Sequence, residues 1–190
     1  MRMLSGIRST HAALGRVARL AMVGACVTLA NAAMGQGVTE VAVKAAFVFK
    51  FLGYVEWPSP ALAGDAPYVI GVAGADGVAT ELERLTAGRM LNGRRITVKR
   101  WHDGDATRGM HVLYVGRAQP NARELLQSFQ RQPVLTITEG ERGLEQGSIV
   151  NLVTLEDRVG FEISQLAAER AGLAISSRML AVARLVIPKT

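Results

Sequence analysis

Cysteine is almost absent from this chain of 190 residues, whose single thiol belongs to Cys26. Cys26 lies in an apolar stretch near the N-terminus, which we interpret below as part of an export signal. Once that segment is removed, the chain can form neither a disulfide nor a thiolate metal site, even in an oxidising compartment. The absence therefore excludes a disulfide framework and control by thiol oxidation in the mature protein.

Acidic residues are absent from residues 1–32, which carry four arginines. This basic stretch is followed by the apolar run 20–30 (LAMVGACVTLA) and then by small residues, among them Ala32 and Ala33. Such an order is typical of a secretory signal peptide. We therefore predict a signal peptide over residues 1–32, cleaved between about residues 32 and 35, and a mature domain over 36–190.

Two other interpretations of the same segment stay open. A membrane anchor needs about 20 apolar residues, whereas the apolar core here runs only from Leu20 to about Gly35 and includes polar residues. Lipidation at Cys26 is weakly indicated by the preceding VGA, but the apolar run continues well past the cysteine. No later run approaches membrane-spanning length, so we expect no membrane span after cleavage.

Basic runs are also lacking, although the formal net charge is +6. Four of the 22 Lys and Arg residues lie in the predicted signal, and the remaining 18 are nearly balanced by 16 Asp and Glu residues. No basic run of the mature chain is longer than that of Arg94 and Arg95. A nucleic-acid interface needs a basic patch or stripe, so we expect no nucleic-acid partner.

Motifs for catalysis and cofactor binding are absent as well. The chain has no Gly-x-Ser-x-Gly elbow, no H-E-x-x-H and no phosphate loop. A glycine triplet that begins at Gly71 has the spacing G-x-x-G-x-x-G, which departs from a dinucleotide-binding loop. The mature chain holds only His102 and His111, and the loop 101–105 (WHDGD) lacks the spacing of metal ligands. We expect a protein that is not an enzyme, with no cofactor and no metal.

Short apolar runs alternate with amphipathic segments between residues 39 and 138. A continuous apolar run predicts a buried strand over 68–73, and further strands are predicted over 96–101, where the pattern alternates, 111–115 and 133–138. Helical periodicity predicts helices over 39–54, 76–87 and 123–131, with the aromatic side chains of the first segment mostly in the core: Phe47, Phe51, Tyr54 and Trp57. This alternation predicts an α/β fold, a single compact domain with a mixed, mostly parallel sheet flanked by helices.

The last third of the chain predicts a C-terminal antiparallel hairpin. Strands over 148–154 and 158–164 are separated only by a turn around residues 156–157, and a connection this short joins antiparallel neighbours. The resulting register produces an apolar face and a second face on which Asn151 lies opposite Glu162. Two helices should follow, over about 165–171 and from about 177 to 186.

The second hairpin face is the candidate binding surface. We predict that a partner or ligand contacts it and the helices after it, through Asn151, Glu162, Ser164, Arg170, Ser176 and Arg178. A buried Glu162 would need Asn151, Ser164 or a cation such as Arg178 as its partner, because an unpaired buried carboxylate is costly. The solvent side of an edge hairpin is the other interpretation of the same pattern.

Several segments resemble the YfiR-like family of periplasmic proteins. The first is residues 42–58 (AVKAAFVFKFLGYVEWP), and the strongest are 147–153 (GSIVNLV), 159–164 (VGFEIS) and 171–183 (AGLAISSRMLAVA). The similarity covers nearly all of the mature chain in the same order. Two departures stand out: the mature chain has no cysteine, so the family's thiol-based control is not carried over, and Ser164 stands where the family often has Asn.

The resemblance implies a periplasmic regulator rather than an enzyme. Such a protein binds the periplasmic sensor domain of an inner-membrane diguanylate cyclase and holds it inactive, which lowers cyclic di-GMP, and it forms homodimers. A periplasmic small-molecule binding protein, whose ligand enters near Asn151, Glu162 and Ser164, is the alternative function.

Overall fold

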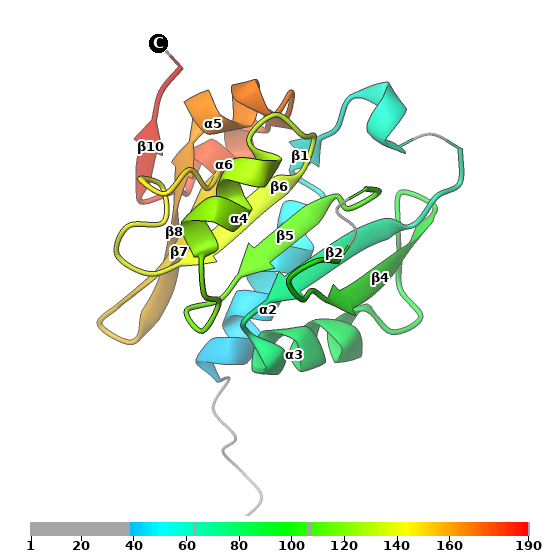
Figure 1. The fold of residues 1–190 in the computed structure, drawn as a ribbon, viewed down its shortest axis with the longest axis horizontal. Coiled ribbons are helices and arrows are strands. Elements are labelled where there is room, and N and C mark those ends of the chain that lie inside the picture. Colours follow the sequence, from blue (N-terminus) through cyan, green and yellow to red (C-terminus); the bar gives the residue numbers. More distant parts are fainter. Residues whose placement is uncertain (1–38, 63, 106–107, 190) are drawn as a thin grey trace, which may run out of the picture. The chain divides into compact units, whose positions relative to one another are not determined.

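The computed structural model describes residues 39–62, 64–105 and 108–189, so the predicted signal peptide lies outside the described residues. Eight strands form one sheet (Figure 1). In spatial order they are β10 (Leu185–Ile187), β8 (Arg158–Ser164), β7 (Val150–Leu155), β6 (Leu135–Glu139), β5 (Val112–Val115), β2 (Tyr68–Ala73), β4 (Arg94–Arg100) and β3 (Met90–Leu91). Neighbours run parallel except in the pairs β7–β8 and β3–β4. The predicted α/β fold with a mixed, mostly parallel sheet is confirmed.

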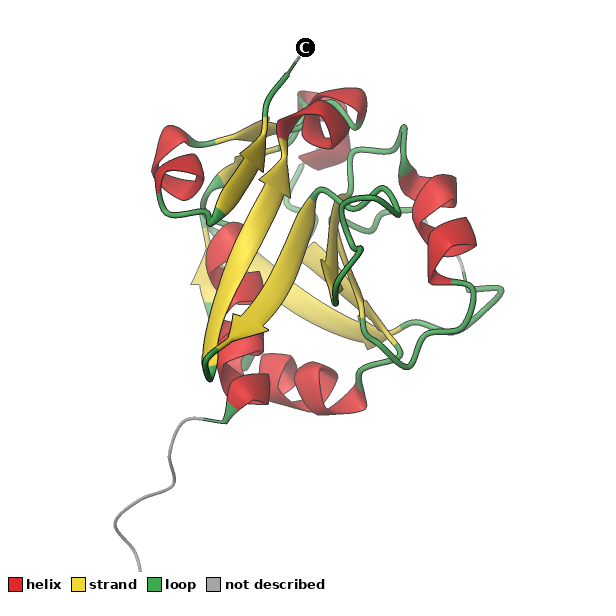
Figure 2. Cartoon of the chain, turned by 90° about the vertical axis from the view of Figure 1, so that its left-hand side faces the viewer, coloured by secondary structure: helices red, strands yellow, loops and turns green. Residues whose placement is uncertain are grey.

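Helices cover both faces of this sheet (Figure 2). On one face α2 (Glu40–Phe51) and α3 (Asp76–Thr86) pack against the largest cluster of buried apolar side chains. On the other face α4 (Ala122–Phe129) packs with Leu113 and Val115 in a second cluster. All four residues of β5 are buried as a result, which explains why this strand is a continuous apolar run rather than an alternating one.

The C-terminal hairpin has the predicted register. Val150 pairs with Ile163 and Asn151 with Glu162, and the turn residues Glu156 and Asp157 have φ angles of 49° and 59°. Positive φ at both central positions is the geometry of a two-residue turn that matches the twist of the strands. The hairpin joins the sheet through β7, which runs parallel to β6.

The end of the chain differs from the prediction. Two short helices follow the hairpin, α5 (Gln165–Arg170) and α6 (Ser177–Ala181). The prediction of a helix to about residue 186 is wrong, because α6 ends at Ala181 and the chain continues as β10 beside β8. β-Branched residues suit a strand better than a helix, and Pro188 ends the segment.

Short pairings that the sequence did not predict tie the ends of the domain together. β1 (Val55–Glu56) pairs with β9 (Ala174–Ile175) in a separate two-stranded sheet. A short 3-10 helix, η2 (Ser59–Leu62), follows β1. These strands have only two residues each, which is too short to produce a detectable alternating pattern.

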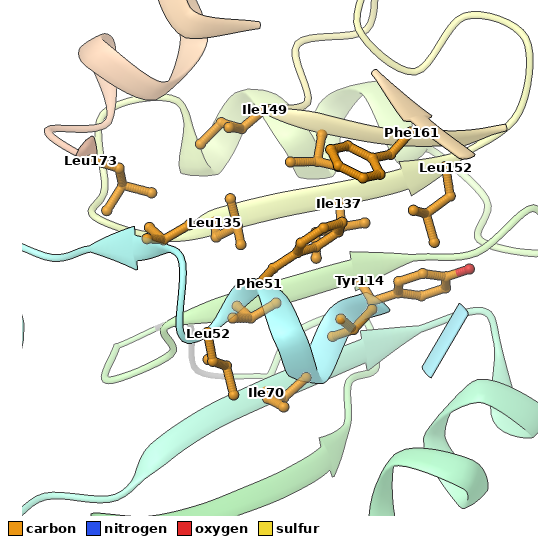
Figure 3. Close-up of a cluster of buried hydrophobic side chains, with 14 of the residues drawn as sticks. Phe51, Leu52, Ile70, Tyr114, Leu135, Ile137, Ile149, Leu152, Phe161 and Leu173 are labelled. Carbon is orange, nitrogen blue, oxygen red and sulfur yellow. The ribbon is translucent and has the colours of Figure 1, made fainter. Parts of the chain in front are cut away.

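The core centres on aromatic packing between α2 and β8 (Figure 3). The rings of Phe51 and Phe161 lie 5.0 Å apart, edge to face. Trp57 is buried as predicted, but Tyr54 is 39% exposed, so its expected place in the core is wrong. Tyr54 follows the end of α2 in a turn, where the helical spacing that predicted its burial no longer applies.

No helix within the described residues is both long and apolar enough to cross a membrane.

Candidate functional site

Asn151 and Glu162 lie opposite each other in the β7–β8 ladder, as the register predicted. Asn151 Nδ2 donates to Glu162 Oε2 at 3.2 Å and to the Gly140 carbonyl at 2.8 Å, while Asn151 Oδ1 accepts from Thr138 Oγ1 at 3.0 Å. The residue is 1% exposed. Its amide therefore holds the loop after β6 in place, and the half-buried Glu162 is the member of the pair nearer to solvent.

The loop after β6 closes tightly over this amide. A Cβ atom at Gly143 would lie 2.0 Å from Thr138 Oγ1 and 2.3 Å from Asn151 Oδ1, so only glycine fits at this position. Thr138 also shares a hydrogen bond of 2.8 Å with Ser148 Oγ. The polar face that the sequence singled out is thus a buried network beneath a loop, with Glu162 at its margin.

The two serines of the predicted surface cap helices. Ser164 Oγ accepts from the Ala167 N–H at 3.2 Å and begins α5, and Ser176 Oγ accepts from the Met179 N–H at 3.3 Å and begins α6. Such caps stabilise a helix by about 1 kcal/mol. Both hydroxyl groups therefore have a structural task in the fold.

The two predicted arginines are exposed and lie apart from this network. Arg170 is in the last turn of α5 and Arg178 is in α6. Neither arginine forms an ion pair with any residue that the structure describes. The ion pair described for the C-terminal segment joins Lys189 Nζ and Glu169 Oε1, which lie 4.0 Å apart. The six predicted residues therefore divide into a buried network, two helix caps and two free cations.

A third arginine, which the sequence analysis missed, lies beside the hairpin face. The side chain of Arg184 fills the space beside Gly160: a Cβ atom there would lie 2.6 Å from Arg184 Cδ. Gly160 and Glu162 share one face of β8 because they are two residues apart. The neighbouring strand β10 places Leu185 beside Glu162 in the ladder.

Apolar side chains are exposed along this C-terminal edge of the sheet. Leu185 and Ile187 of β10 are 49% and 39% exposed, and the preceding Val182 is 70% exposed. We call Val182, Arg184, Leu185, Ile187 and Glu162 the edge surface. The run LVI followed by proline is a strand signal that could have revealed it, but the expected helix included these residues.

A buried ion pair at the carboxyl end of β6 was also missed. Lys44 of α2, 6% exposed, bonds to Glu139 at the end of β6 and lies 2.6 Å from Glu40 Oε1. Glu139 Oε1 also accepts from the Arg117 N–H at 3.3 Å. The spacing of Glu40 and Lys44 is that of a helical i,i+4 pair, but nothing in the sequence indicates that Glu139 completes the group.

The charges of this group stabilise one another. Burial lowers the pKa of Lys44, but hydrogen bonds to Glu139 and Glu40 outweigh it and raise that pKa above its ordinary value. The pKa of Glu40 is lowered by its hydrogen bonds from Lys44 and Thr154. Burial raises the pKa of the nearby Tyr114 phenol, helped by the charge of Glu139. Both shifts favour the charged forms of Lys44 and Glu40.

The crevice in which α/β sheets often bind ligands is closed here. Strand order reverses between β2 and β5, and ligands of such folds bind outside the carboxyl ends of the strands at this point. A Cβ atom at Gly116, after β5, would lie 2.4 Å from the carbonyl oxygen of Gly74, after β2. The two loops pack backbone against backbone. Two open hollows, of about 290 and 260 Å³, flank these loops, and Arg117 and Glu139 line both hollows.

The histidines do not gather into a site. His102 is exposed in its loop, 3.7 Å from Asp105 Oδ2, whereas His111 is buried. His111 Nδ1 accepts from the Val69 N–H at 3.1 Å, and Nε2 lies 2.9 Å from the Ala61 carbonyl. Across the described parts of the chain, no group of three or more His, Cys, Asp and Glu side chains could hold a metal ion.

The described residues contain none of the catalytic motifs considered above. A model of the YfiR/HmsC-like family matches residues 41–184, and the chain belongs to that family. The family consists of regulators of diguanylate cyclase signalling, which are periplasmic in general, rather than catalysts. No curated protein matches the chain.

Proposed function

We propose that this protein is exported to the periplasm, binds the periplasmic domain of an inner-membrane diguanylate cyclase and holds that enzyme inactive. The observation that carries the proposal is the family match, which covers most of the described domain. The edge surface supports it, because β10 is the last strand of the sheet and the side chains of its Leu185 and Ile187 are exposed. Of the residues predicted from sequence, Glu162, Arg170 and Arg178 are accessible enough to touch a partner.

The mechanism is a shift between two states of the cyclase. A protein that binds the inactive state more tightly than the active state moves the equilibrium toward inactivity, by an amount set only by that difference in affinity. Starting from equal populations, keeping about 99% of the enzyme inactive requires roughly a hundredfold preference, or about 2.7 kcal/mol. One interface of moderate size provides a free-energy difference of this order.

Deletion in the native cell tests the proposal. Removing the gene should raise cyclic di-GMP, and the full-length gene supplied in trans should restore the original level. The control is a set of strains in which each membrane diguanylate cyclase with a periplasmic domain is also deleted. One of those cyclase deletions should abolish the rise in cyclic di-GMP. An unchanged cyclic di-GMP level after deletion, or a rise that survives every cyclase deletion, would contradict the proposal.

A direct assay uses that cyclase in nanodiscs, where both membrane faces are accessible. The protein, expressed from its full gene and purified from the periplasm, should inhibit cyclic di-GMP synthesis from GTP in a saturable manner. Inhibition that requires an added small molecule would instead favour the small-molecule binding function.

A further inference from the structure

We infer that the uncovered half of one sheet face, over β2, β4 and β3, binds an acidic, amphipathic helix of the partner. This inference rests on the proposed function, since the partner is the periplasmic domain of the cyclase. It specifies a second contact, at the other end of the sheet from the edge surface, and the chemistry of the segment that fills it.

The parallel strands β2 and β4 have a helix on only one of their faces. They are joined by α3, which packs with Ile70 and Val72 of β2 on that face. The next connection, from β4 to β5, has no helix in its described residues, 101–105 and 108–111. Parallel sheets are usually covered on both faces. Figure 1 shows α4 in front of β6, whereas β2 and β4 are seen with no helix in front of them.

The uncovered half of the face has its own set of side chains. Arg95, Thr97 and Lys99 are alternate residues of β4 and therefore share a face. Val69 of β2 pairs with Thr97, and Met90 of β3 pairs with Arg95, so both belong to the same face. Met90 is 61% exposed, and Val69 and Met90 pack against neither cluster of buried side chains. We call these five residues the shelf.

The cations of the shelf are unpaired, unlike their neighbours on the opposite face of β4. Residues 84–102 include six Lys and Arg residues and no Asp or Glu. On the opposite face, Arg94 donates to backbone carbonyls and Arg100 bonds to carboxylates of α3. Arg95 and Lys99 are exposed and form no ion pair with any residue that the structure describes. This positive charge favours an acidic occupant.

The shape around the shelf favours a helix over a membrane surface. Ala73 is on the same face of β2 as Val69 and belongs to the same buried cluster as Phe129 of α4, so α4 stands beside the shelf. A helix is about 10 Å thick, and a flat membrane would meet α4 before it reached β4. A partner helix beside α4 would take the place that a crossover helix has in folds of this class.

Charge and spacing define that helix further. A symmetric contact with a second copy of this chain would bring Arg95 and Lys99 of both copies together, which like charges oppose. The two cations are four residues apart on one strand, a distance of roughly 13 Å. On a helix that runs along β4, acidic residues seven or eight positions apart span about 11–12 Å and lie on one face. Apolar residues between them would contact Val69 and Met90.

Charge reversal in the shelf tests the contact, with Arg131→Glu as the matched control. Arg131 follows α4, is exposed and forms no ion pair with described residues. Affinity is measured for the full-length cyclase identified above, in nanodiscs of phosphatidylcholine, which has no net charge. Lys99→Glu and Arg95→Glu should each weaken binding about tenfold, since each places a carboxylate against an acidic helix. Arg131→Glu should bind like the unmodified protein.

A fluorescent label at Thr97 tests whether the shelf is covered. Thr97→Cys is combined with Cys26→Ser, so that the introduced thiol is the only one in the chain, and is labelled with an environment-sensitive fluorophore. Addition of the cyclase nanodiscs, but not of empty nanodiscs, should shift the emission to shorter wavelength or, where the label blocks the shelf, binding should weaken at least tenfold. The same label on Arg131→Cys should do neither. Thermal unfolding confirms that each variant is folded.

The outcomes separate this inference from the proposed function. If the unmodified protein does not bind the cyclase, the proposed function fails and the inference with it. If it binds, and neither charge reversal nor the label at Thr97 changes affinity or emission, the function stands and the shelf contact is wrong.

Two further results would assign the shelf to another occupant. Binding to phosphatidylglycerol vesicles that Lys99→Glu abolishes, with cyclase binding unchanged, would assign it to a membrane. A dimer that Lys99→Glu dissociates, again with cyclase binding unchanged, would assign it to a second copy of this chain. Either result overturns the inference.

Discussion

Lys44 and Glu139 form a buried ion pair across 95 positions of the chain, joining the first helix of the domain to the carboxyl end of β6. The Gly140 carbonyl, one residue further on, accepts from Asn151. A continuous polar path therefore runs from α2, around the end of β6, to Glu162 at the edge surface. It links the N-terminal helix to the region that we propose contacts the partner.

Removing only the cation should be more harmful than removing both charges. Lys44→Met leaves the Glu139 carboxylate, whose side chain is 11% exposed, without its partner, and an uncompensated buried charge costs about 3 kcal/mol. The double variant Lys44→Met/Glu139→Gln removes that charge and should recover most of the loss. Urea unfolding measures both free energies. Equal stability of the single and double variants would show that the pair is not coupled.

Phe51→Ala should destabilise the domain by about 3–5 kcal/mol, because it opens a cavity beside Phe161 and Phe47. Tyr54→Ala is the matched control. Its ring is exposed, so the loss should stay below about 1 kcal/mol. The measurement is denaturant unfolding of both variants. A Phe51→Ala protein that unfolds like the unmodified protein but does not bind the cyclase would place this helix at the interface.

Acid should weaken the fold through His111. Burial lowers the pKa of His111, with a smaller contribution from the Arg94 charge, and the acceptor role of Nδ1 toward the Val69 N–H requires the neutral ring. A lowered folded pKa means that the unfolded chain binds the proton more readily. The contribution of neutral His111 to the free energy of unfolding is therefore complete above pH 6.5, the ordinary pKa of histidine, and is lost as the pH falls below that value.

The test compares the unmodified protein with His111→Gln by urea unfolding between pH 8 and about 5. The variant should be less stable at pH 8 but should lose less stability on acidification. Parallel pH profiles of the two proteins would mean that His111 does not titrate differently in the folded state.

Glu162→Gln should separate binding from folding. Glutamine retains the shape and an oxygen for Asn151 Nδ2, which lies 3.2 Å from Glu162 Oε2, so the unfolding free energy should change by less than about 1 kcal/mol. We expect a folded, exported protein that no longer inhibits its cyclase, so that cellular cyclic di-GMP rises. A folded variant that inhibits as well as the unmodified protein would remove Glu162 from the contact.

The sequence predicted elements with strong local patterns and missed those that depend on distant partners. Tyr68–Ala73 is a strand with the predicted bounds, and the hairpin register followed from the turn and the two-residue period alone. Glu139 offered no such signal, because its burial depends on Lys44 from a distant helix. β10 was assigned to a helix since three residues are too few for periodicity to distinguish strand from helix.

The candidate site was only partly predictable for the same reason. Register placed Asn151 opposite Glu162, but burial of Asn151 results from the loop around Gly143, whose path the sequence does not specify. The predicted helices begin near both serines, yet capping occupies the hydroxyl groups that a partner would need. Arg184 became relevant only once β10 was placed beside β8.

The pairing of β1 with β9 has a consequence for the order in which the domain folds. Val55 pairs with Ile175, and the ring of Phe51 packs on Phe161, so the first helix acquires part of its cover from the last quarter of the chain. Contacts between such distant residues slow folding, because a long loop must close before they form. A chain still being synthesised cannot complete this core. Folding therefore finishes only once the C-terminal segment arrives.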